Sequence, residues 1–297
     1  MAIVLSLLGV VLVAVALRDV FDTLFHPHGR GVISHALIRA AWRVLRRSAR
    51  ARHNALSLAG PLAFVSVIAG WGVLVVVGFA LMLWPRLDDG FAFDPALDPA
   101  QQDGFLDALY ISLVNLTSLG YGDIVPTSDL LRLLGPLETL IGLGLLTASI
   151  SWILFLYRVL ADYRSLSHEI SLLMEVERSS ESGLAETEPT AAARVLADLT
   201  SRVVTMRDDL VHSPIAYYFR PRDARHALPV LLPALLEVVE RCSAPDRAEA
   251  LRFQARMLNQ AIADLLTTIA EDFLDAPLAD AEAALAGYRR DHLWASA

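Results

Sequence analysis

Ala108-Leu-Tyr-Ile-Ser-Leu-Val-Asn-Leu-Thr-Ser-Leu-Gly-Tyr-Gly-Asp-Ile-Val-Pro126 is a short apolar segment that runs into a glycine-rich turn. The apolar part, from about Phe105 to Thr117, is too short to cross a bilayer as a helix, because a crossing needs about 20 residues. We predict a short helix here, with Asp103 as its N-cap. Non-helical backbone at membrane depth is tolerated only inside protein or beside water. The stretch therefore indicates a re-entrant helix followed by a buried or water-lining turn.

Long apolar segments flank this stretch and predict membrane-spanning helices. They run from about Leu56 to Trp84 and from about Leu133 to Tyr157, and another runs from about Ala2 to Phe25. Each is long enough to span the hydrocarbon core as a helix. The first could instead be a signal peptide cleaved after Ala14-Val15-Ala16, but no basic residue precedes its apolar run. We therefore expect three spans, with the first one uncleaved.

The charges between the spans predict the orientation of the chain. Residues 26–54 hold arginines and no acid, so the positive-inside rule places them in the cytoplasm. The charged residues between positions 85 and 132 are mostly aspartates, so this stretch is expected outside. The N-terminus then lies outside, and everything after about Arg158 is cytoplasmic. Because the basic residues other than histidine are all arginine, a usage typical of GC-rich genomes, we expect a multi-pass protein of a bacterial inner membrane.

The arginine-rich loop between the first two spans predicts an amphipathic helix over Ile33–Arg52. Leu37, Ala41 and Val44 are expected on its apolar face, with arginines on another face. A basic amphipathic helix between two spans is expected to lie on the inner leaflet. Whether it only anchors the loop or also takes part in gating is left open by the pattern.

The stretch and its flanks resemble the pore domain of potassium channels of the prokaryotic, two-transmembrane type. In that family a pore helix is followed by Thr-Val-Gly-Tyr-Gly and then an aspartate. Here the turn reads Ser118-Leu119-Gly120-Tyr121-Gly122, followed by Asp123. The likeness covers about Leu56–Tyr157. It implies an all-α membrane channel in which four chains surround one pore and conduct potassium passively.

The resemblance assigns Thr117–Asp123 to the ion selectivity filter. Such a filter replaces the water around potassium with a ladder of backbone oxygens. Carbonyls that all face one axis need alternating, partly left-handed backbone, which glycine adopts at little cost, so Gly120 and Gly122 are expected to supply it. The pore helix would end with its negative dipole end toward the cation. The expected potassium ligands are the carbonyls of Ser118, Leu119, Gly120 and Tyr121.

The acid after the filter needs a partner. In the family a pore-helix acid often holds it, but Val114 stands at that position here. We predict instead a hydrogen bond from the Tyr110 hydroxyl to the Asp123 carboxylate; the alternative is an aspartate solvated at the outer mouth. Ile111 stands where the family often has a second aromatic, and it cannot form a hydrogen bond with the Tyr121 hydroxyl. Tyr110 is therefore expected to support the filter.

The third span is expected to line the pore. In the family this helix often bends at a glycine, and Gly142 stands at the matching position. Close packing of helices is an equally good reason for a small residue there. Glu138, one turn earlier, is either a functional ionisable group or a paired structural acid behind the filter. Helical periodicity places the expected pore-lining residues on one face: Thr139, Leu143, Leu146, Ile150 and Leu154.

Residues 161–297 predict a cytosolic helical domain. They hold 14 arginines against 22 acids, which accounts for the net charge of -8 and gives no basic patch for nucleic acid. No glycine-rich nucleotide fingerprint is present. After a linker at Ser179–Gly183 we expect helices at about Pro189–Val211, Ala227–Arg241, Pro245–Leu274 and Pro277–Asp291.

The expected organisation has three parts. Residues 1–55 form the N-terminal transmembrane and interfacial helices, 56–160 the pore domain and 161–297 the cytosolic domain. We expect no enzymatic activity and no cofactor besides permeant potassium ions. The expected partners are further copies of the chain in a homotetramer, the lipid bilayer, and an unidentified cytosolic ligand or protein. A weakly selective cation channel, and a membrane-anchored sensor or scaffold with a vestigial pore, remain as alternatives.

Overall fold

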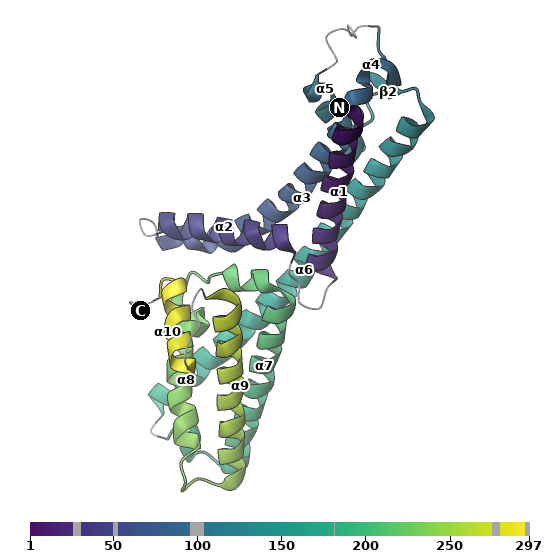
Figure 1. Cartoon of the computed structure of the whole chain (residues 1–297). Helices are drawn as coiled ribbons and strands as arrows, with labels where there is room; N and C mark the ends of the chain where they lie inside the picture. Colours follow the sequence, from purple (N-terminus) through teal and green to yellow (C-terminus); the bar gives the residue numbers. More distant parts are fainter. Residues whose placement is uncertain (26–30, 50–52, 96–103, 181, 275–279, 295–297) are drawn as a thin grey trace. The chain divides into compact units, whose positions relative to one another are not determined.

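The computed structural model describes residues 1–25, 31–49, 53–95, 104–180, 182–274 and 280–294. Most of these residues are helical, so the expected all-α class is confirmed (Figure 1). The chain divides into two compact units, each built from two segments. The first unit holds residues 1–40 and 63–154, and the second holds residues 41–62 and 155–297.

Three helices are long and apolar enough to cross a membrane. They are α1 (Ala2–Leu24), α3 (Ala59–Leu83) and α6 (Asp129–Ser179). All three predicted spans fall on these helices. The sequence also predicts that the third helix continues beyond its span, and α6 is indeed one helix of 51 residues.

Two glycines allow α1 and α3 to approach each other closely. A Cβ added at Gly9 would lie 2.3 Å from the carbonyl oxygen of Gly78, and one added at Gly78 would lie 2.7 Å from Cγ2 of Val13. Small residues at such crossings let helix backbones pack in van der Waals contact. The core beside this crossing also takes in α6, through Ile141 and Leu145.

A buried carboxylate on α1 caps the start of α2 (Val32–Ala49). Asp19, only 4% exposed, accepts hydrogen bonds from the N–H groups of Ile33 at 2.7 Å and Ser34 at 3.0 Å, and from the Ser34 hydroxyl. The indole N–H of Trp71 on α3 donates to the same carboxylate at 2.8 Å. Because the first N–H groups of a helix have no partner within the helix, one acid here satisfies two of them.

The amphipathic helix forms, and the residues that it buries within the chain differ from the face expected on the inner leaflet. Val44 is 62% exposed, whereas Ile38 and Trp42 are buried. The buried stripe is therefore displaced by one residue, which is about 100° around the helix. Within the second unit, the Trp42 ring packs on Tyr218 and His292, and such tertiary contacts are invisible to a sequence pattern. The end of the predicted helix, at residues 50–52, lies outside the described residues.

A small antiparallel ribbon, which no pattern in the sequence indicates, follows α3. The chain passes through α4 (Leu87–Gly90) into β1 (Phe91–Phe93), which pairs with β2 (Ile124–Pro126). Between the two strands along the chain lies α5 (Phe105–Leu116), the short helix expected from the sequence. Figure 1 shows α4, α5 and β2 gathered at one end of the first unit.

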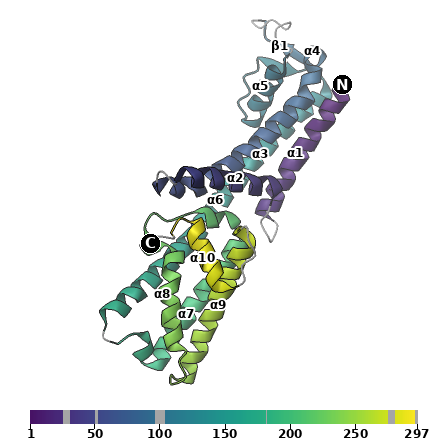
Figure 2. The same ribbon diagram turned by 60° about the vertical axis from the view of Figure 1, so that its left-hand side comes forward.

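The second unit is a helical domain built on the C-terminal part of α6. Its predicted helices are all present, with bounds that differ by a few residues, and α7 and α9 run side by side (Figure 2). Two short 3-10 helices, at Pro214–Tyr218 and Ala224–His226, lie between α7 and α8. The helices of the domain are α7 (Pro189–His212), α8 (Leu228–Cys242), α9 (Glu249–Phe273) and α10 (Ala281–Asp291).

The α1–α3 crossing predicts a position-specific response to alanine. We expect Gly9→Ala to lower the free energy of unfolding by about 1–3 kcal/mol, because its Cβ would press on backbone that has no room to move. The matched control is Gly72→Ala on α3, where nothing lies within 4 Å of the added Cβ. Unfolding midpoints of the purified protein in detergent measure both. Equal midpoints for the two variants would contradict the crossing.

Candidate functional site

The short helix α5 begins and ends with backbone groups that are satisfied locally. Its N-cap is Gly104, whose N–H donates to the Asp107 carboxylate at 3.1 Å. The prediction of Asp103 as N-cap is therefore wrong by one residue, and Asp103 itself lies outside the described residues. At the other end the N–H groups of Ser118 and Leu119 donate to carbonyls within the last turn of α5, each at 3.0 Å. This pair of bonds is a Schellman motif, which requires a left-handed residue just after the helix.

Ser118 is that left-handed residue, and the chain then alternates. The φ angles of Ser118, Gly120 and Gly122 are 59°, 58° and 78°, while Leu119 and Tyr121 between them are not in the left-handed region. The predicted left-handed backbone at the two glycines is confirmed. Ser118 was missed, because a Cβ disfavours this conformation by roughly 1–2 kcal/mol and serine is not the usual residue there.

Conformation, rather than lack of space, explains the two glycines in a single chain. A Cβ added at Gly120 or Gly122 meets nothing within 4 Å. An L-residue there would nevertheless be strained, because its φ lies in the region that only glycine adopts freely. The positive φ values are therefore the feature that the sequence Gly-Tyr-Gly encodes.

Asp123, which follows the alternating segment of residues 118–122, is fixed by hydrogen bonds. The Tyr110 hydroxyl donates to Oδ2 of Asp123 at 2.6 Å, as predicted. This hydrogen bond, together with burial and the nearby negative charge, raises the pKa of Tyr110 to about 12, so the phenol remains the donor at neutral pH. The carbonyl of Asp123 accepts from the Asp94 N–H at 2.7 Å. Both the side chain and the backbone of Asp123 are thus fixed.

The ribbon holds the chain that leaves the segment. Phe91 pairs with Pro126, Ala92 with Val125 and Phe93 with Ile124. The N–H of Thr127 donates to the Gly90 carbonyl at 2.9 Å. The residues after Asp123 are therefore tied to the chain that follows α3, and the segment is fixed at both its ends.

Glu138 connects α6 to α5. It is fully buried, and it accepts hydrogen bonds from the Ser112 hydroxyl and from the Asn115 amide, the latter at 3.3 Å. Ser112 also lies 3.0 Å from the carbonyl oxygen of Val76 on α3. Of the two interpretations left open by the sequence, the contacts match the paired structural acid. Ser112 and Asn115 were missed; their spacing of three in an apolar helix, on the face toward an acid, is the signal that could have identified them.

Gly142 is in contact with the end of α5. A Cβ added there would lie 2.2 Å from the carbonyl oxygen of Leu116, whereas one added at Gly144 would meet nothing within 4 Å. Close packing is therefore a sufficient reason for glycine at position 142. Thr139, one turn away, donates its hydroxyl to the Asn115 carbonyl at 2.8 Å.

The predicted pore-lining residues divide into two groups. Thr139 is half-buried against α5, so it does not present its hydroxyl to open space in this chain. The other four lie exposed along one face of α6: Leu143, Leu146, Ile150 and Leu154. Thr117, expected in the filter, turns its hydroxyl back to the Leu113 carbonyl at 2.6 Å. The segment 118–123, Tyr110 and Glu138 are thus gathered around α5, and the exposed leucine and isoleucine row continues along α6.

The comparisons with known proteins agree with this geometry. Residues 66–156 match a protein-family model described as "Ion channel". The chain is also similar to the uncharacterized membrane protein YdjJ of Bacillus subtilis (strain 168), with 25% identity over 170 residues. That alignment covers 54% of this chain and 47% of the relative, so the chain spans about half the length of the curated relative it matches. No solved structure matches the chain.

The family match covers the elements that carry the site. It takes in most of α3, all of α5, the segment 118–123 and the first half of α6, and it lies within the stretch that resembles a channel pore by its sequence. Two of the three helices that can cross a membrane contribute to it. Residues 66–156 are therefore similar to an ion-channel domain.

Proposed function

We propose that the chain is one subunit of a tetrameric channel that conducts potassium passively across a bacterial inner membrane. The observation that carries the proposal is the alternating left-handed backbone at Ser118, Gly120 and Gly122, directly after the carbonyl end of a short buried helix. Alternation of this kind turns successive carbonyl oxygens toward one side of the chain. Such a row of oxygens can replace the hydration shell of a monovalent cation.

Closure of the pore requires further copies of the chain. Leu119 and Tyr121 are 58% and 67% exposed in the single chain, although both are large and apolar. In a ring of four subunits these side chains would pack between neighbours and leave the carbonyls of residues 118–121 to face the axis. The exposed row from Leu143 to Leu154 on α6 would line the path below them.

Fixed ligand positions favour a selective filter over a weakly selective one. The segment is anchored by the Schellman motif before it, and by the Tyr110–Asp123 bond and the β1–β2 ribbon after it. A filter held at both ends keeps its oxygens at one spacing. A sensor or scaffold with a vestigial pore would not need left-handed backbone at three alternate positions, each of which restricts the chain.

Reconstituted protein tests the proposed function. Wild-type protein in liposomes is expected to release potassium and to pass much less sodium under the same gradient, measured by ion flux and by reversal potentials under bi-ionic conditions. Gly120→Ala is expected to abolish selective flux, because a Cβ disfavours left-handed backbone by roughly 1–2 kcal/mol in each of four subunits. Gly72→Ala, where the Cβ has open space on α3, is the control. Equal potassium and sodium flux in wild type would support the weakly selective alternative, and no flux at all would support the scaffold.

The hydrogen bond from Tyr110 to Asp123 predicts a change in how quickly current is lost during sustained opening. Tyr110→Phe removes a charge-assisted hydrogen bond of about 1.5–3 kcal/mol while it keeps the ring. We expect normal assembly but faster loss of current during sustained opening, because Asp123 loses its side-chain partner. The control is Thr267→Val, which removes a hydroxyl from an exposed position on α9 that bonds only within its own helix. Identical time courses for wild type and Tyr110→Phe, in single-channel or bilayer recordings, would count against a supporting role.

The two glycines of α6 give opposite expectations. Gly142→Ala should reduce conduction strongly, because its Cβ would displace the Leu116 carbonyl and with it the start of the filter. Gly144→Ala should conduct nearly as wild type, because the added Cβ meets nothing in the chain. If instead flexibility alone matters here, both alanines should act alike, since each stiffens the helix by about 1 kcal/mol. Macroscopic flux from liposomes at matched protein density measures the difference.

A further inference from the structure

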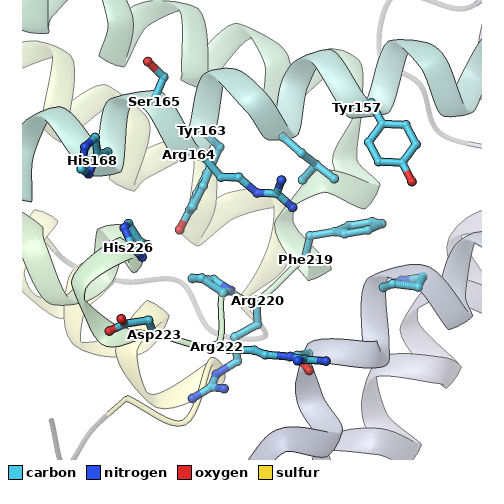
Figure 3. Close-up of a pocket in the computed structure, with 14 residues that line it drawn as sticks. Tyr157, Tyr163, Arg164, Ser165, His168, Phe219, Arg220, Arg222, Asp223 and His226 are labelled. Atoms are coloured by element: carbon cyan, nitrogen blue, oxygen red, sulfur yellow. The ribbon is translucent and has the colours of Figure 1, made fainter.

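The second unit contains a cavity that the channel function does not use. Its volume is about 780 Å³, within the range of small-ligand sites. Figure 3 shows its walls: Tyr157, Arg164 and His168 extend from α6, and Phe219 to His226 come from the segment before α8. All of the lining residues belong to the second unit.

The lining is basic in an otherwise acidic part of the chain. Three arginines and two histidines line the cavity, and Asp223 is the only acid among its lining residues. That acid already has a partner, because the Arg225 guanidinium donates to it at 2.8 Å and lowers its pKa. The positive charge of the lining is therefore not balanced by the cavity's own carboxylate. Residues 161–297 as a whole carry the chain's net charge of -8.

The arginines of the cavity have unused hydrogen-bonding capacity. Among the described residues, the guanidinium groups of Arg164 and Arg222 form no hydrogen bond or ion pair. Arg220 is only 5% exposed; its Nε donates to the His292 carbonyl at 2.8 Å and its guanidinium lies 3.9 Å from the Trp294 ring centroid. Its Nη2 is buried without a hydrogen-bond partner in the described part of the chain. Buried charged donors are normally satisfied, so this nitrogen is available to an anion.

Two further donors face the same space. The rings of His168 and His226 lie 5.9 Å apart and come from opposite walls (Figure 3). A neutral imidazole offers one N–H donor and a cationic one offers two, so the pair can bind an anion in either state. Tyr157 and Phe219 add flat apolar surface for the organic part of a ligand.

We propose that this cavity binds a phosphate-bearing ligand. Guanidinium groups match phosphate oxygens in paired hydrogen bonds, and three arginines line a space large enough for more than the phosphate alone. The phosphate can belong to a soluble phosphate ester or to the headgroup of an anionic phospholipid, since both present the same oxygens. The site lies on α6, the helix whose earlier part carries the exposed leucine row, so a bound ligand contacts the same continuous element.

Binding to the purified full-length chain tests this proposal independently of conduction. In detergent, inorganic pyrophosphate and ATP are titrated, and binding is followed by the unfolding midpoint and by calorimetry. In vesicles, phosphatidylcholine alone is compared with phosphatidylcholine containing phosphatidic acid. Wild type is expected to show a saturable rise of the midpoint with at least one probe. Arg164→Gln and Arg222→Gln should each weaken that response about tenfold or more, as the loss of a charge-assisted hydrogen bond would.

Arg178→Gln is the matched control. Arg178 lies on the same helix, pairs with Glu175 at 3.1 Å on the surface and does not line the cavity, so its loss should leave binding unchanged. A response to the soluble probes identifies a soluble ligand, and a response only to phosphatidic acid identifies a lipid headgroup. No response to any probe, or equal responses in the cavity variants and in Arg178→Gln, would overturn the proposal.

Discussion

The contact between the carbonyl end of α5 and α6 is the constraint on which the arrangement of residues 66–156 depends. Glu138 is buried against Ser112 and Asn115, Thr139 binds the Asn115 carbonyl, and the Leu116 carbonyl lies directly on Gly142. Together these contacts fix both the rotation and the depth of α5. The left-handed segment begins two residues later, so its position is set by this contact before the Tyr110 bond and the ribbon fix its far end. An apolar contact alone would not select one rotation of so short a helix, because hydrophobic packing is non-directional.

The parts of the site that follow from local chemistry were predictable, and the parts that follow from neighbours were not. Glycine spacing identified the left-handed backbone at Gly120 and Gly122, and the resemblance to a known pore sequence, with Val114 in place of its acid, pointed to the Tyr110–Asp123 bond. Ser118 escaped because its conformation is imposed by the end of α5 rather than by its own side chain. On the third span, helical periodicity identified the exposed face of α6. It could not show that Thr139, the first residue predicted on that face, donates a hydrogen bond to α5.

Apolar length and proline positions predicted the limits of α1, of α3 and of the helices of the second unit. The buried face of α2 could not be predicted, because it depends on aromatic contacts of Trp42 that no local pattern contains.

Net charge misrepresents residues 161–297 for a related reason. Residues 161–297 are acidic as a whole, and that sum argues against anionic partners. The fold nevertheless brings Arg164, Arg220 and Arg222 to one cavity from two segments more than fifty positions apart along the chain. The neighbouring acid, Asp223, is occupied by Arg225. Local electrostatics is thus determined by which charges are already paired, and composition carries no information about pairing.

The buried carboxylate of Asp19 has a consequence for how the protein enters the membrane during synthesis. An aspartate in an apolar helix opposes insertion by up to roughly 2.5–3.5 kcal/mol at the centre of the bilayer. Three of its four hydrogen bonds come from the start of α2, and the fourth comes from Trp71, 52 positions further along the chain. When α1 first leaves the ribosome, none of these donors exists yet. The order of translation therefore sets when the carboxylate of Asp19 gains its partners, first from the start of α2 and then from α3.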